Sequence, residues 1–118
     1  MAAWGYHIML DCSGCDQKKI KDKNHIWVFV KTLIKRVGMK AHGNMMIENL
    51  LQGTDNEGYS VLQMIVTSNI TCHFVNKTGS AYIDLFSCKE FEAEIVIATV
   101  KEFFSPTAMK LNFVERQA

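Results

Sequence analysis

Residues 58–88, GYSVLQMIVTSNITCHFVNKTGSAYIDLFSC, decide the fold of this 118-residue chain. They contain three short runs rich in β-branched and aromatic residues, at 59–66, 70–75 and 81–88. Such runs are typical of β-strands. The turn sequence NKTG at 76–79 separates the last two, and short connections of this kind favour hairpins. We therefore expect the three strands to pair antiparallel.

One amphipathic helix is predicted before these strands in the sequence and one after them. Residues 24–37 carry apolar side chains at intervals of three and four, and Gly38 provides a stop. Residues 91–104 repeat this spacing, and the only proline, Pro106, follows their end. The positions expected on the buried faces are Ile26, Trp27, Phe29, Val30, Leu33, Ile34 and Val37 in the first helix, and Ile95, Ile97, Ala98 and Val100 in the second.

The remaining segments complete a sheet. Residues 5–12 form an apolar run closed by a Ser-Gly turn, residues 39–48 suit a strand, and residues 52–58 are rich in turn formers. Apolar and polar residues alternate from Met109 onward, as in a final strand. The order of elements predicts an α+β two-layer sandwich, with an antiparallel β-sheet and two helices packed on one face. The length predicts a single domain over residues 1–118.

Composition narrows the class of protein. Hydrophobic residues make up 48% of the chain and charged residues 21%, which is typical of a folded domain. A net charge of +1 favours neither nucleic acid nor an anionic membrane as a partner. No secretory leader or spanning segment is evident, so we expect a cytoplasmic protein whose four cysteines are reduced.

The strand region from residue 60 to residue 88 concentrates groups capable of nucleophilic and proton-transfer chemistry. These are Ser60, Ser68, Thr71, Cys72, His73, Ser80 and Cys88. Together they suit nucleophilic catalysis, although the sequence does not show which of them touch. Strand alternation predicts that Cys72 faces away from Thr71 and His73 and lies in the core. Cys12 and Cys15 form a Cys-x-x-Cys motif, but no second pair stands at metal-ligand spacing, so no metal site is expected.

Residues 58–73, followed by 81–88, resemble the core of the short prokaryotic S-adenosylmethionine decarboxylases, which are pyruvoyl-dependent. In that family a serine stands eight residues before the cleavage serine, a histidine five residues after it and a cysteine twenty residues after it. Ser60, His73 and Cys88 stand at these offsets from Ser68. Residues 5–7 and 14–16 also resemble the family's first strand and the loop after it, so the resemblance covers most of the chain.

The resemblance implies a self-processing enzyme. Cleavage between Thr67 and Ser68 would give a β chain, 1–67, and an α chain, 68–118, whose first residue becomes a pyruvoyl cofactor derived from Ser68. Ser60 would position the rearranging bond, and His73 would act as base in the elimination that follows. Cys88 would return a proton to the substrate carbon after carbon dioxide leaves. The resemblance also implies a homodimer of αβ protomers, with active sites near the interface, and S-adenosylmethionine as a small-molecule substrate for spermidine synthesis.

The chain departs from the family beside the cleavage serine and at residues expected to hold the adenosine of the substrate. The family's Glu-Ser-His is Thr67-Ser68-Asn69 here, and Val75 and Lys77 stand where the family has a tryptophan and a glutamate. The loop at 52–58 is longer, which leaves Leu50 or Leu51 in the region of the family's substrate-stacking aromatic. Two alternatives therefore stay open. One is a pyruvoyl-dependent decarboxylase of arginine or ornithine, and the other is a regulatory homologue that does not cleave itself.

Overall fold

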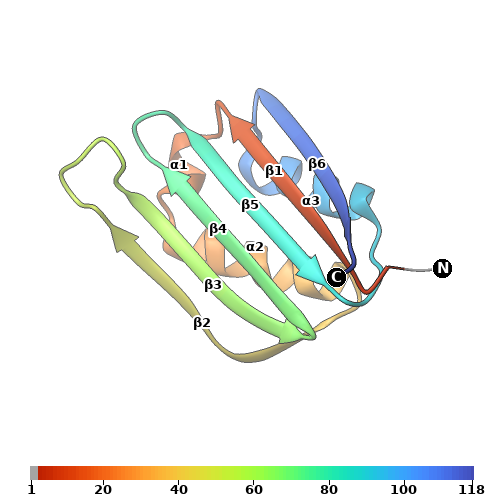
Figure 1. Cartoon of the computed structure of the whole chain (residues 1–118). Helices are drawn as coiled ribbons and strands as arrows, with labels where there is room; N and C mark the ends of the chain where they lie inside the picture. The colour runs from red at the N-terminus through yellow and green to blue at the C-terminus, as the bar shows by residue number, and fades with distance from the viewer. Residues whose placement is uncertain (1–2) are drawn as a thin grey trace.

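The chain forms one six-stranded antiparallel sheet with helices over one of its faces (Figure 1). The computed structural model describes residues 3–118. Its elements are β1 (Gly5–Ser13), α1 (Gln17–Ile20), α2 (Lys23–Arg36), β2 (Lys40–Leu50), β3 (Gly58–Val66), β4 (Ser68–Val75), β5 (Ser80–Ser87), α3 (Ala93–Phe104) and β6 (Ala108–Arg116). The strand order is β2-β3-β4-β5-β1-β6. The predicted fold class is confirmed, including the antiparallel pairing of the three central strands.

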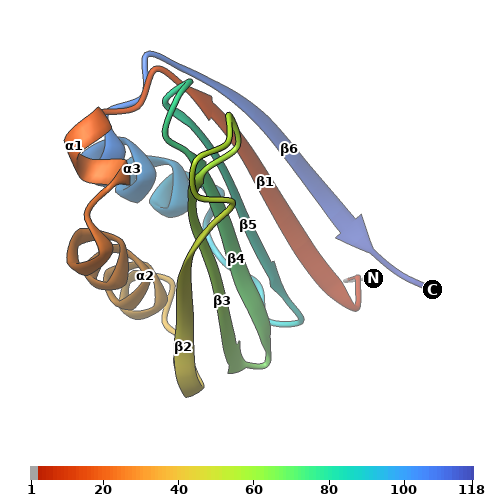
Figure 2. The same cartoon turned by 90° about the vertical axis from the view of Figure 1, so that its left-hand side faces the viewer.

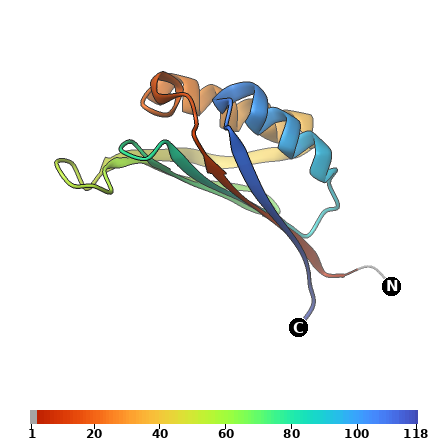
Figure 3. The same cartoon turned by 90° about the horizontal axis from the view of Figure 1, so that it is seen from above.

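The helices cover one face of the sheet and leave the other bare (Figures 2 and 3). Alternate residues of each central strand point at the helices and are buried, as Val61, Ile70, Cys72 and Leu85 show. One element was not predicted. The single-turn helix α1 begins at Asp16, whose carboxylate accepts hydrogen bonds from the backbone of Lys18 and Lys19.

The predicted buried faces of the helices were wrong at several positions. Trp27 is 46% exposed. Successive helical residues are rotated by about 100°, so Trp27 lies outside the buried face that contains Ile26 and Phe29. In α3 the fully buried side chains are Val96, Thr99, Val100 and Phe104, whereas Ala98 is exposed and Ile95 and Ile97 are only partly buried. The Thr99 hydroxyl enters the core because it donates to the carbonyl of Ile95 one turn earlier.

An aromatic cluster joins both long helices to the sheet. The Phe104 ring lies 4.8 Å from that of Phe29 on α2 and 5.0 Å from that of Phe74 on β4, measured between centroids. All three side chains are at most 2% exposed. Tilted and edge-on aromatic pairs at these separations add to the free energy of burial.

No helix among residues 3–118 has the length and apolarity of a membrane-spanning segment.

The aromatic cluster should dominate stability. Phe104→Ala leaves a cavity between the helices and the sheet, and we expect it to lower the free energy of unfolding by about 3–5 kcal/mol. Leu111→Ala is the matched control, because Leu111 is 46% exposed on the edge strand β6, and it should cost less than about 1 kcal/mol. Urea unfolding followed by circular dichroism measures both values. Equal losses would contradict the central role of the cluster.

Candidate active site

The bare face of the sheet carries most of the predicted chemistry. On β3 and β4, Ser60, Thr71 and His73 alternate with the buried residues Val61 and Cys72. Since side chains alternate across a strand, these three polar groups point away from the helices. Cys72, predicted as a core residue, is fully buried. Alternation on paired strands therefore separates the functional face from the packing face.

Ser60 and His73 form a contact on this face. They are direct cross-strand partners in the β3–β4 pair, and the Ser60 Oγ lies 3.0 Å from His73 Nδ1. A cavity of about 250 Å³ adjoins them, with Met46, Glu48, Leu50 and Leu62 among its lining residues. This pair can exchange a proton between a hydroxyl and an imidazole, which is the chemistry of a general base.

The predicted cleavage position lies at the other end of β3 and β4. Thr67 occupies the turn between the two strands, and its Oγ1 contacts the Sγ of Cys88, which follows β5. Ser68 has a φ of 136°, a conformation that side-chain-bearing residues rarely adopt. Backbone strain of this kind costs about 1–3 kcal/mol and is concentrated at functional sites. The bond predicted to break is thus followed by a strained residue and lies beside a thiol.

Cys88 is the accessible thiol of the four. Cys12, Cys15 and Cys72 are buried, whereas Cys88 is partly exposed. Burial raises the pKa of the Cys72 thiol, which makes it less reactive. A hydrogen bond between the Cys12 and Cys15 thiols raises the pKa of Cys12 and lowers that of Cys15. Within the described residues no group of three or more potential ligands could hold a metal ion.

The predicted site residues lie in two separate groups in one chain, with Thr67, Ser68 and Cys88 in one group and Ser60 and His73 in the other. Ser68 pairs with Ile65 and Ser87 at one end of the strands, and Ser60 pairs with His73 near the other end. His73 is five positions after Ser68 along β4, which corresponds to about 16 Å at the usual rise per residue. His73 therefore does not reach the Thr67–Ser68 bond of its own chain. The sequence offsets gave no indication of this separation.

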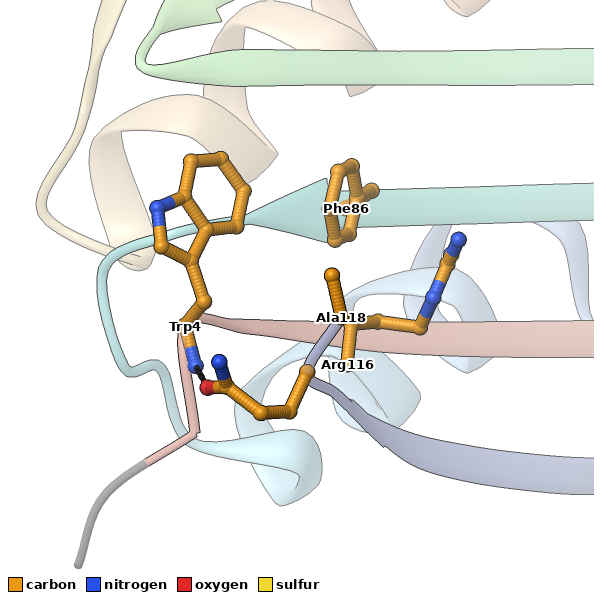
Figure 4. Close-up of a pocket in the computed structure, with 5 residues that line it drawn as sticks. Trp4, Phe86, Arg116 and Ala118 are labelled. Carbon is orange, nitrogen blue, oxygen red and sulfur yellow. Dashed lines mark hydrogen bonds between the residues drawn. The ribbon is translucent and has the colours of Figure 1, made fainter.

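A second set of polar groups near the cleavage end was missed by the sequence analysis. Phe86 is the cross-strand neighbour of Asn69, and with Trp4 and Arg116 it lines a cavity of about 380 Å³ (Figure 4). Arg116 lies 5.0 Å above the Phe86 ring and 3.4 Å from His7 Nδ1. No local pattern could have found this cavity, because its residues come from both ends of the chain and meet only through β1 pairing with β5 and β6.

The departures from the family at Val75 and Lys77 follow His73 in the chain, whereas those at Thr67 and Asn69 lie at the cleavage end. The Lys77 ammonium is 3.0 Å from the Asp55 carboxylate in the neighbouring loop, and Lys77 does not line the cavity beside His73. Leu50 lines that cavity. Leu51 follows the end of β2 and is 60% exposed, and it does not line the cavity.

Cys88 should be the thiol that reacts first in the folded protein. We expect iodoacetamide under native conditions to add one carbamidomethyl group to Cys88 while the three buried thiols stay unmodified. Peptide mass mapping locates the label. Cys88→Ser provides the control and should abolish this first modification. Labelling of Cys12 or Cys72 at a similar rate would contradict the assigned burial.

Comparison with known proteins agrees with this architecture. The family model for S-adenosylmethionine decarboxylase matches residues 6–117. The S-adenosylmethionine decarboxylase proenzyme of Clostridium botulinum is 25% identical over 99 residues, covering 83% of this chain and 81% of that protein. The proenzyme of Methanococcus vannielii is 26% identical over 117 residues, covering 98% of this chain and 92% of that protein.

A solved structure extends the match to three dimensions. The adenosylmethionine decarboxylase from Aquifex aeolicus superposes with a TM-score of 0.85 over 100% of this chain and 94% of that one, at 18% sequence identity. At this identity the likeness demonstrates a shared fold. Because the family model spans nearly the whole chain, the protein belongs to the S-adenosylmethionine decarboxylase family.

Proposed function

We propose that this chain is a self-processing, pyruvoyl-dependent decarboxylase of S-adenosylmethionine, cut between Thr67 and Ser68. One observation carries the proposal: the Cys88 thiol contacts the residue whose carbonyl the cleavage attacks. The strained φ of Ser68 supports it, because breaking the bond on its N-terminal side would release that strain. Membership of the family supplies the substrate.

The proposed cleavage uses groups of this chain and one water molecule. The Ser68 hydroxyl attacks the Thr67 carbonyl, and the amide becomes an ester. A base then removes the Ser68 Cα proton, and the Thr67 carboxylate leaves by β-elimination. Water replaces the nitrogen of the resulting dehydroalanine, and ammonia is released. The α chain then begins with a pyruvoyl group at position 68.

The residues around position 68 fit such a group. Its carbonyl would supply an electron sink for a substrate amine as the carboxylate departs. Cys88 lies beside this position and is partly exposed, and a thiol can act as a proton donor. Cys88 therefore serves as the proton donor to the substrate carbon.

The proposed base must come from a second copy of the chain, because the Ser60–His73 pair and Ser68 lie at opposite ends of β4. The bare face offers a surface for this contact. Its exposed apolar side chains, Met46, Leu62, Met64 and Val66, lie side by side on β2 and β3, and burying such a patch favours association.

A two-fold axis running between two such sheets, perpendicular to the strands, would complete the site. This operation turns the bare faces toward each other and reverses the direction of the strands. The Ser60–His73 end of one copy then faces the Thr67–Ser68 end of the other. We therefore propose a homodimer of αβ protomers with two shared active sites.

Decarboxylation of arginine or ornithine by the same pyruvoyl chemistry is the second candidate. Two observations favour it: Val75 has no aromatic face for a nucleobase, and Lys77 provides no carboxylate to bind ribose hydroxyls. Carbon dioxide release from each substrate in turn separates the two candidates.

The intact mass of the purified protein tests the cleavage. We expect two fragments that meet between residues 67 and 68, with the second lacking a free amino group because it begins with a pyruvoyl carbonyl. Ser68→Ala should remain a single chain of full length, since it has no attacking hydroxyl. A wild-type chain that stays intact after prolonged incubation would instead support a regulatory homologue.

A mixed dimer tests whether His73 acts across the interface. Ser68→Ala and His73→Ala chains should each remain uncut alone. When they are co-expressed with different tags, the His73→Ala chain should be cut, because its Ser68 then faces the intact His73 of its partner. Mass spectrometry of each tagged chain gives the result. An uncut His73→Ala chain in purified heterodimers would contradict a shared site.

A further inference from the structure

A row of polar side chains crosses the bare face at the level of His73. Each of the six strands contributes one member through direct cross-strand pairing: Glu48, Ser60, His73, Tyr82, Asp11 and Lys110. The neighbouring positions Met46 and Leu62 are apolar. The row therefore places a carboxylate next to the Ser60–His73 pair, at a position that no step of the cleavage uses.

Glu48 lines the cavity that adjoins the Ser60–His73 pair. Its direct partner is Ser60, so their backbones lie about 4.8 Å apart, the usual distance between strands. Met46, Leu50 and Leu62 supply aliphatic walls to the same cavity of about 250 Å³. His73 is the one other titratable side chain in the lining.

The Glu48 carboxylate has no cationic partner among residues 3–118. The ion pairs of the described chain join His7 to Asp84, Arg36 to Glu102 and Lys77 to Asp55. The Glu48 side chain is exposed in the single chain, and its attraction for a positive charge would strengthen where a second copy covers the bare face and removes water from it. The cavity therefore complements a ligand with a short aliphatic stem that ends in a positive centre.

We propose that Glu48 is the substrate-specificity residue of this protein and selects α-amino acids with a positive centre on the side chain. This inference rests on the proposed function, in which the amino acid joined at position 68 of one copy extends over the Ser60–His73 pair of the other. The sulfonium of S-adenosylmethionine, the ammonium of ornithine and the guanidinium of arginine all carry this charge. A neutral or acidic side chain does not match it.

Binding to an uncut protein tests this assignment independently of activity. In the Ser68→Ala chain, backbone amide resonances are followed by NMR during titration with S-adenosylmethionine, L-ornithine, L-arginine and L-citrulline. Citrulline is the neutral analogue of arginine with nearly the same shape. At least one cationic probe should shift the amides of residues 46–50, Ser60 and His73, with an affinity about tenfold higher than that of citrulline.

Glu48→Gln in the same background should reduce the affinity for that cationic probe to the level of citrulline. Glu94→Gln is the matched control, because Glu94 is exposed in the first turn of α3 on the helical side of the sheet, and it should change nothing. The probe whose affinity falls most in Glu48→Gln identifies the cation that the site binds.

Two results would overturn the assignment. The first is that none of the three cationic probes binds more tightly than citrulline. The second is that Glu48→Gln leaves the affinities of the cationic probes unchanged. Failure of the proposed function would appear separately, as a wild-type chain that is never cut.

Discussion

The packing of α2 and α3 against one face of the antiparallel sheet is the constraint on which everything else in this protein depends. Phe104 contacts both Phe29 and Phe74, so the two helices and the central strand share one aromatic cluster. Because side chains alternate along a strand, half of them point toward the helices and the other half lie on the opposite, uncovered face. Val61 and Cys72 are buried in the core. Their neighbours Ser60, Thr71 and His73 therefore point to the uncovered face, where a ligand can reach them.

The same sheet keeps the reactive groups apart. A strand is a rigid spacer, and the five-position offset from Ser68 to His73 along β4 sets a separation that no rotation of side chains can close. Strand pairing fixes Ser60 beside His73, and the chain turn fixes Thr67 beside Cys88. A single chain therefore holds two separate groups of polar side chains, Thr67 beside Cys88 and Ser60 beside His73. A symmetric pair of chains is the simplest arrangement that unites them, since one operation completes both sites at once.

The bare face combines polar and apolar surface in a way that suits both association and substrate binding. Exposed methionine, leucine and valine side chains on β2 and β3 adjoin the row that contains Glu48, Ser60 and His73. Association would remove water from these groups and strengthen the interaction between a carboxylate and a positive substrate. At the other end of the strands, Arg116 and Phe86 border the cleavage position. The two ends of the strands thus present different chemical groups.

The sequence by itself determined the order of elements and the antiparallel pairing of residues 58–88. These follow from local periodicity and turn chemistry, and the offsets of Ser60, His73 and Cys88 from Ser68 carried the family resemblance. Local periodicity did not fix the rotation of each helix, so Trp27 and Ala98 were wrongly assigned to the core. Only the tertiary structure decided that Thr67 touches Cys88, that His73 lies far from Ser68 along one strand, and that Glu48 adjoins Ser60. These relations arise from pairing between residues distant in the chain, and no local sequence pattern records the register of such pairs.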